Sequence, residues 1–543
     1  METVSIVLFL LLAVVVSGAI SRMLPISIPT PLVQILLGAV IGLSTSHRVD
    51  LNPELFLFLF LPPLLFLDGW RIPKDELLKD VSTVVELALG LVLLTVVGMG
   101  FFIHWMIPAM PLAVAFALAA VVSPTDPIAV SAIAARVPIP KRMMHILEGE
   151  SLLNDASGLV CLRFAITAAL TGSFSAGTAA LNFLWVAGAG IAIGVAVTLV
   201  VSRVKAWVTK RWGEDIGSQI LVSLLIPFGS YMLAEHVHAS GILAAVAAGV
   251  TMTFAEISRQ AMAVTRMRRN SVWDTIQFTL NGIIFVLLGE QLPAILEGAR
   301  NTVSLTGHAS PWWLAIYTGA IVAGLALLRF GWVWASLHLT ILRKAERGVG
   351  MQGPNWRLVA ATSVAGVRGA ITLAGVLTLP LVMNDGTDFP ARDLAIFLAA
   401  GVIVVSLIVA SISLPVLLNG LTMPPEPSKQ AEEDRARIAT AQAAIRAIER
   451  RQHALAEDHG EADIYATAGG RVMDRYRERI EGLSGQQADE MRAGNRLVSE
   501  LSLVGVKAER AALATLIRDR RLGSEVARKL TRELDLAEAR YRG

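Results

Sequence analysis

Residues Val121 to Val130 read VVSPTDPIAV and lie inside an apolar run, Leu112 to Ala135, that is long enough to cross a bilayer. Pro124 and Pro127 stand on either side of Asp126. Proline lacks a backbone N–H and clashes with the carbonyl four residues earlier, so we predict that regular helix is interrupted here. Irregular backbone at mid-membrane depth is tolerated only where it is buried in protein or lines a wet cavity. The stretch is therefore expected to lie on an ion or substrate pathway; the alternative is a structural kink whose Asp is neutralised by an arginine.

The next apolar run begins with a second polar stretch, Glu148 to Val160, which reads EGESLLNDASGLV. In a helix, Ser151 and Asp155 share one face, and Glu150 and Asn154 share a neighbouring one. A carboxylate at the bilayer centre costs about 2.5–3.5 kcal/mol on insertion scales, so these acids must face a partner, a cation or water. Oxygen-bearing side chains beside a broken helix are typical of the Na⁺ sites of secondary transporters.

The composition is that of a membrane protein. Of 543 residues, 54% are hydrophobic and only 17% are charged, and the mean hydropathy is +0.60. The one cysteine, Cys161, excludes an internal disulfide and any Cys-based metal site. The first positive charge, Arg22, follows the first apolar run, which predicts an uncleaved first helix with its N-terminus outside.

We predict about thirteen transmembrane helices, and loop charge sets their direction. Loops after odd-numbered spans carry nineteen Lys and Arg residues, whereas those after even-numbered spans carry three, so the odd loops and the C-terminus are expected in the cytoplasm. The spans are Val4–Ile20, Ile26–Ser44, Leu55–Leu67, Val81–Trp105, Leu112–Ala135, Leu147–Leu170, Leu181–Val204, Ile216–Ala234, Ser240–Phe254, Val272–Leu288, Trp312–Leu342, Leu358–Val382 and Leu394–Leu418.

The composition changes near Met423, which predicts two domains. Residues 1–422 form a transmembrane domain, and residues 423–543 are charged and Ala-rich. Ile438, Ala441 and Ile445 recur at helical spacing, so the second part is expected to be a helical cytosolic tail. Its role is open between regulation and a solvated packing or dimerising element.

Two arginines lie within predicted spans. Arg329 is in the eleventh span and Arg368 in the twelfth. Because arginine stays charged, each is a candidate counter-charge for an acid at membrane depth, with Glu150 and Asp68 as the candidate acids. Purely structural pairing is the alternative for both arginines.

The twelfth span also contains Gly366, Gly369 and Gly375, which predict a second break in helix. The fifth and twelfth spans are seven apart, so equivalent helices of two repeats would cross the membrane in opposite directions. Paired broken helices in inverted repeats indicate a transporter's midplane site.

Four motifs resemble a known family: SPTDP, GESLLNDASGLV, NGIIFVLLGEQL and GVRGAITLA. They resemble the sodium/proton exchangers of the cation/proton antiporter 1 family, and the resemblance covers roughly Val4 to Leu418. It implies a homodimer in a bacterial plasma (inner) membrane, in which each protomer has a dimerisation subdomain and a core subdomain crossed by two broken helices.

The resemblance also implies roles for individual residues. Asp126 and Asp155 would bind the cation, with oxygens from Thr125 and Ser151 and with Glu150 assisting through water. Asn154 before Asp155 is the Asn-Asp pair associated with electroneutral one-for-one exchange. Arg329 and Arg368 match arginines that pair with acids of the core, whereas Asp68 departs from relatives that have Glu.

These features predict an antiporter that exchanges Na⁺, or Li⁺ or K⁺, for H⁺ at one buried Asp site. A bound cation favours the ionised carboxylate and excludes the proton, so competition couples the two fluxes. A potassium/proton exchanger is the main alternative, followed by a cation channel and then a proton-coupled carrier of an organic solute. An enzyme is the least expected class, and no cofactor or nucleic acid is implied. The predicted role is pH and sodium homeostasis.

Overall fold

The computed structural model describes residues 2–24, 28–44, 53–71, 90–127, 130–131, 141–172, 176–257, 263–305, 312–345, 356–419, 427–459, 462–484, 488–519, 522 and 524–542. Within these ranges the chain is helical and forms no β-strand, so the predicted all-α class is confirmed. The chain divides into two compact units, Met1–Leu421 and Thr422–Gly543.

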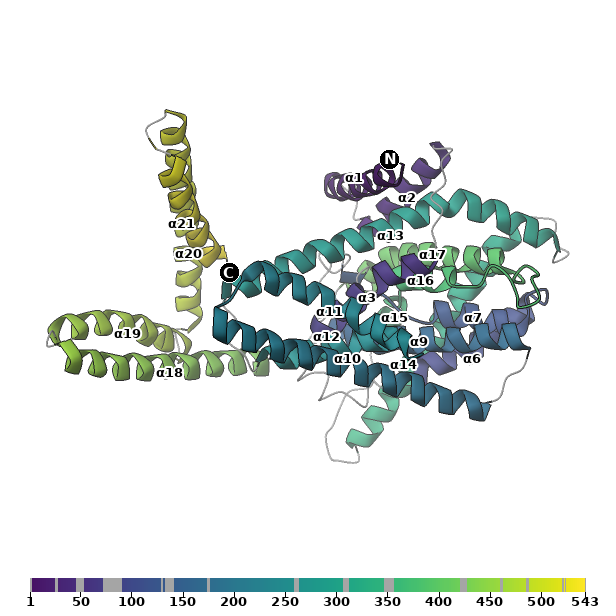
Figure 1. Cartoon of the computed structure of the whole chain (residues 1–543), viewed down its shortest axis with the longest axis horizontal. Coiled ribbons are helices and arrows are strands. Elements are labelled where there is room, and N and C mark those ends of the chain that lie inside the picture. The colour runs from purple at the N-terminus through teal and green to yellow at the C-terminus, as the bar shows by residue number, and fades with distance from the viewer. Residues whose placement is uncertain are drawn as a thin grey trace. The chain divides into compact units, whose positions relative to one another are not determined.

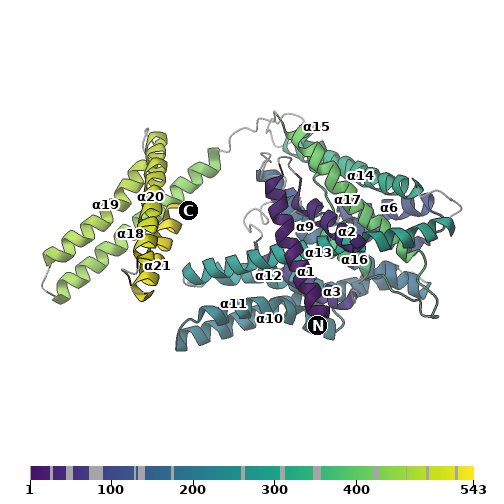
Figure 2. The same ribbon diagram turned by 90° about the horizontal axis from the view of Figure 1, so that it is seen from above.

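The first unit contains two groups of helices, each packed mainly within itself. We call the first group the scaffold bundle, and α10, α11 and α12 of this group lie side by side in Figure 1 and Figure 2. It consists of α1 (Glu2–Met23), α2 (Thr30–Ser44), α3 (Pro53–Arg71), α10 (Ala176–Trp212), α11 (Ile216–His236), α12 (Gly241–Ile257) and α13 (Ala263–Leu305).

The second group, the crossing bundle, contains both predicted helix breaks. It consists of α6 (Val92–Met106), α7 (Leu112–Val122), α9 (Lys141–Thr171), α14 (Trp312–Ala345), α15 (Trp356–Val364), α16 (Ala370–Leu377) and α17 (Arg392–Leu418). The bundles touch mainly where α13 packs on α17, and where α3 and α13 contact α16.

Helices of the first unit match the predicted spans in order. Among the described residues, six helices are long and apolar enough to cross a membrane, and further apolar helices are shorter. The start of the fourth predicted span and the end of the fifth lie outside the described residues, so the number thirteen stays a prediction.

Both predicted breaks are present. α7 ends at Val122, the backbone is not helical from Ser123 to Asp126, and helix resumes at Pro127. The twelfth span is divided into α15 and α16 by the non-helical residues 365–369. Proline chemistry accounts for the first break, and at the second the glycines leave room for the side chains of Arg329 and Asp126.

Helix α13 is held against α2 by backbone contacts at glycines. A Cβ atom added at Gly38 would lie 2.0 Å from the carbonyl oxygen of Val286, and one at Gly289 would lie 2.0 Å from that of Ile35. Only glycine allows this separation, which is the means by which membrane helices approach closely. The middle of α13 is therefore fixed relative to the scaffold bundle.

The second unit is two helical hairpins. α18 (Pro427–His459) packs against α19 (Ala462–Ser484), and α20 (Ala488–Arg518) packs against α21 (Ser524–Arg542) (Figure 1). Arg510 joins the second pair, since its guanidinium lies 2.6 Å from carboxylate oxygens of both Asp535 and Glu538.

Candidate functional site

The two helix breaks meet and bond to each other. The backbone N–H of Asp126 donates a hydrogen bond to the carbonyl of Val367 at 2.7 Å. A Cβ atom added at Gly369 would lie 1.7 Å from Oδ2 of Asp126, so no larger residue fits at this crossing. The crossing therefore places the Asp126 carboxylate against the second broken helix.

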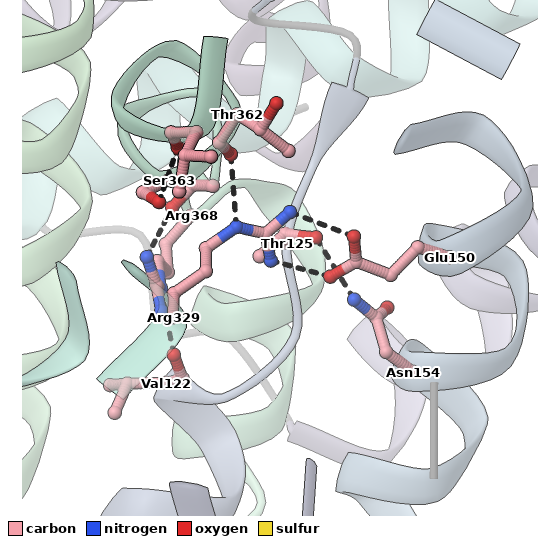
Figure 3. Close-up of polar contacts among 10 residues, drawn as sticks. Val122, Thr125, Glu150, Asn154, Arg329, Thr362, Ser363 and Arg368 are labelled. Carbon is pink, nitrogen blue, oxygen red and sulfur yellow. Dashed lines mark hydrogen bonds and ion pairs between the residues drawn. The ribbon is translucent and has the colours of Figure 1, made fainter. Parts of the chain in front are cut away.

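Arg368 stabilises the broken backbone at the same point. Its Nε donates to the carbonyl of Val122 at 2.8 Å (Figure 3), and another guanidinium nitrogen donates to the carbonyl of Gly366. Its own backbone N–H donates to the hydroxyl of Ser406 on α17 at 3.2 Å. The carbonyls that a broken helix leaves unbonded thus receive a buried cationic donor.

Arg368 was predicted to face an acid, with Asp68 as one candidate. Instead its side-chain hydrogen bonds go to carbonyls from both sides of the crossing, and Asp68 lines a cavity. The guanidinium of Arg368 is bound by carbonyls that the broken helices leave without a partner, and not by a carboxylate.

Glu150 and Arg329 form a buried two-pronged ion pair. The two terminal nitrogens of Arg329, Nη1 and Nη2, donate to the two carboxylate oxygens of Glu150 at 2.5 and 2.7 Å (Figure 3). Nε of Arg329 donates to the carbonyl of Thr362 on α15 at 3.1 Å. This pair connects α9, α14 and α15 and supports the second broken helix from outside the crossing.

Asn154 connects α9 to the first break. Its Nδ2 donates to the hydroxyl oxygen of Thr125 at 2.9 Å, and both side chains are buried (Figure 3). The amide thereby orients Thr125 one residue before Asp126. Ser151 points toward Asp155 on the same helix, at 3.5 Å between Oγ and Oδ2, which is too long for a strong hydrogen bond.

These side chains surround a cavity of about 20 Å³, which we call the cation cavity. That volume accommodates about one water-sized species. Its polar lining consists of Asp68, Thr125, Asp126, Ser151, Asp155, Asn281 and Thr372.

Most of the predicted site residues are thus brought together. Thr125, Asp126, Ser151 and Asp155 all line the cation cavity, whereas Glu150 does not and is engaged with Arg329. Sequence reasoning missed Asn281, although a polar residue in the apolar tenth span was a signal for it.

A second, wider cavity of about 550 Å³ adjoins the first, and we call it the vestibule. It shares Asp68, Pro127, Ser151 and Asn281 with the cation cavity. Its further polar residues are Thr30, Gln34, Arg71, Ser131, Glu148, Asp274 and Gln277. The two cavities therefore meet at these four shared residues.

Within the described part of the chain, no three His, Cys, Asp or Glu side chains form a group that could hold a resident metal ion. The oxygens around the cation cavity come from carboxylates, hydroxyls and an amide. Such a set suits a hard cation.

Two broken helices that cross beside buried carboxylates define a secondary transporter of cations. A model of the family described as sodium/hydrogen exchanger, transmembrane, matches residues 8–420. The chain belongs to this family, and it is a multi-pass membrane antiporter of cations and protons.

Two relatives cover nearly all of the chain. The uncharacterized Na(+)/H(+) exchanger YjcE of Escherichia coli (strain K12) is 42% identical over 99% of each chain. The sodium, potassium, lithium and rubidium/H(+) antiporter of Bacillus subtilis (strain 168) is 36% identical over 100% of this chain and 78% of its own length.

A solved structure shares the fold. The sodium proton antiporter MjNhaP1 from Methanocaldococcus jannaschii at pH 8 superposes with a TM-score of 0.60 at 19% identity. The match covers 78% of this chain and 99% of that chain.

Proposed function

We propose that the protein exchanges Na⁺, and with it Li⁺ or K⁺, for H⁺ with one-for-one stoichiometry across the bacterial plasma membrane. Asp126 and Asp155 bind the cation, with oxygens from Thr125 and Ser151. The observation that carries the proposal is that these four side chains line one cavity at the crossing of the two broken helices.

Competition for this cavity provides the coupling. The cavity accommodates about one small species. A cation next to Asp155 stabilises its ionised form, whereas the empty, buried site favours the protonated form. Loading with one substrate therefore displaces the other, and the ion gradients set the direction of exchange.

Glu150 assists only indirectly in this scheme. Its carboxylate holds Arg329, which in turn holds the carbonyl of Thr362 on α15. Asn154 keeps a neutral amide beside Asp155 and positions Thr125, which supports an electroneutral cycle.

Alternating access comes from movement of the crossing bundle against the scaffold bundle. The crossing bundle supplies the core subdomain and the scaffold bundle the dimerisation subdomain of a homodimer. By loop charge, the N-terminus lies outside, the tail of residues 423–543 lies in the cytoplasm, and the vestibule opens toward the cytoplasm, because Arg71 and Asp274 lie beside cytoplasmic loops. The role is pH and sodium homeostasis.

The range of cations that we propose for this protein follows the name of a relative. The Bacillus subtilis antiporter is named for sodium, potassium, lithium and rubidium. We therefore keep potassium/proton exchange as the second candidate function for this chain.

The test is dequenching of a pH-sensitive dye in everted vesicles that contain the protein. Addition of Na⁺, Li⁺ or K⁺ should release accumulated protons, and vesicles with Asp155→Asn should show no release. A cation current without proton movement would instead indicate a channel and overturn the proposal.

A further inference from the structure

Asn281 is the polar side chain of α13 that lines both the cation cavity and the vestibule. It lies at their junction and is only 8% exposed. Its amide is not among the fully enclosed polar atoms that lack a partner in the described part of the chain, and it borders the open space of both cavities. An amide that borders a cavity presents an oxygen acceptor and N–H donors to a species inside it, so the group is available to a cation there.

The position of Asn281 is rigid. A Cβ atom added to its neighbour Gly282 would lie 2.6 Å from the side chain of Val14 and 3.0 Å from that of Gln34. Further along α13, the close backbone contacts with α2 at Gly38 and Gly289 leave no room for α13 to slide along α2. The amide is therefore held in place by the scaffold bundle.

The other ligands proposed above have a different origin. Thr125, Asp126, Ser151 and Asp155 come from the crossing bundle, whereas Asn281 comes from the scaffold bundle. If the bundles move against each other, the first four travel with the cation and Asn281 stays behind.

We propose that the amide oxygen of Asn281 is a cation ligand at the junction of vestibule and cation cavity, present only while the cavity faces the vestibule. This rests on the proposed function. A neutral oxygen replaces part of the hydration shell without adding a titrating group, so it changes cation affinity and selectivity but not stoichiometry.

A ligand at the junction with the vestibule affects cation binding from one side of the membrane, whereas a purely structural residue would affect binding from both sides. Loss of the amide should weaken cation binding from the vestibule side by about tenfold, a fold-change on the scale of losing one polar contact to a charged group. Binding from the opposite side should change by less than about twofold, because Asn281 no longer borders the cavity in that state.

The experiment compares Asn281→Leu, Asn281→Asp and wild type, with Asn270→Leu as the control. Asn270 is an exposed asparagine on the same helix and lines neither cavity. Half-saturating Na⁺, Li⁺ and K⁺ are measured in everted vesicles and in right-side-out proteoliposomes, and the Kd of Na⁺ is measured by calorimetry on purified protein.

The expected result is a higher half-saturating concentration for Asn281→Leu on the vestibule side only, with a changed preference among the three cations. Asn281→Asp, which keeps an oxygen, should restore affinity, and Asn270→Leu should match wild type. An unchanged Kd for Asn281→Leu, or an equal rise on both sides, would overturn the inference.

The calorimetric arm separates this inference from the proposed function. If wild-type vesicles exchange nothing but the purified protein binds Na⁺ more tightly than Asn281→Leu, then the exchange proposal fails and the ligand assignment stands. If Asp155→Asn abolishes exchange and Asn281→Leu changes neither affinity nor selectivity, then the exchange proposal stands and the assignment of Asn281 as a ligand fails.

Discussion

Arg329 donates two hydrogen bonds to the carboxylate of Glu150, at 2.5 and 2.7 Å, and the side chains are 3% and 1% exposed. A buried pair of this kind contributes little when compared with a well-packed apolar pair, but breaking it leaves an uncompensated charge. Arg329→Gln or Glu150→Gln should therefore each destabilise the protein by about 3–5 kcal/mol.

The double variant Glu150→Gln with Arg329→Gln removes both charges and should recover much of the thermal stability, which is measured as Tm in detergent. It should retain part of its exchange, because Glu150 lies outside the lining of the cation cavity and supports α15 only through Arg329. A well-folded double variant without exchange would show that Glu150 assists the cation directly.

Asp155 is the carboxylate that the proposed competition depends on most, because it is buried and lines the cavity beside Ser151. Asp155→Asn should insert normally but lower exchange by about a hundredfold or more, the usual scale for loss of an essential carboxylate. Asp385→Asn is the matched control, since Asp385 lies in an exposed loop, where it accepts hydrogen bonds from Thr387. Wild-type rates from Asp155→Asn in the dye assay would remove this residue from the site.

Asn154 is expected to keep exchange electroneutral. In Asn154→Asp the hydroxyl of Thr125 can donate where it now accepts, so the contact between the two residues is preserved while a second titrating acid is added. Exchange by this variant should respond to an imposed membrane potential, and wild-type exchange should not. A wild-type response to potential would contradict one-for-one exchange.

Gly369 is required by the crossing itself. In Gly369→Ala the new Cβ atom would coincide with the Asp126 carboxylate, 1.7 Å from Oδ2, so that carboxylate or the broken helix must shift. Exchange should fall to the background rate although the protein still inserts. The control is Gly375→Ala in α16, which follows the break, where the nearest atom is the end of the Leu159 side chain at 3.2 Å. Equal activity of the two variants would be inconsistent with a tight crossing.

The tail is expected to be dispensable for exchange. Deletion of residues 428–543 removes almost all of the second compact unit and no residue that lines the cation cavity or the vestibule. The truncated protein should retain exchange in vesicles, with a changed expression level or pH dependence. Complete loss of exchange in a truncated protein that still inserts would place part of the transport machinery in the tail.

Local chemistry in the sequence was enough to predict the helices and both of their breaks. Pro124 and Pro127 mark the first break, although single or paired prolines inside α3, α11, α13 and α17 leave those helices continuous. Gly366 and Gly369 mark the second break. The spacing of Ser151 and Asp155 likewise predicted a shared helix face, because that spacing is a property of the helix alone. These predictions needed no knowledge of neighbouring helices.

Contacts between residues that are distant in the chain could not be predicted from local sequence. Glu150 and Arg329 are 179 residues apart, and Arg368 reaches the carbonyl of Val122 across 246 residues. Each arginine had several acids and carbonyls within reach at membrane depth, and the sequence does not say which helix faces meet. Tertiary packing decided that Arg329 takes the carboxylate, that Arg368 takes the freed carbonyls, and that Asn281 borders the cation cavity. The sequence by itself determined which groups could not remain unpaired in lipid, because that cost belongs to each group; only the fold determined what each one was paired with.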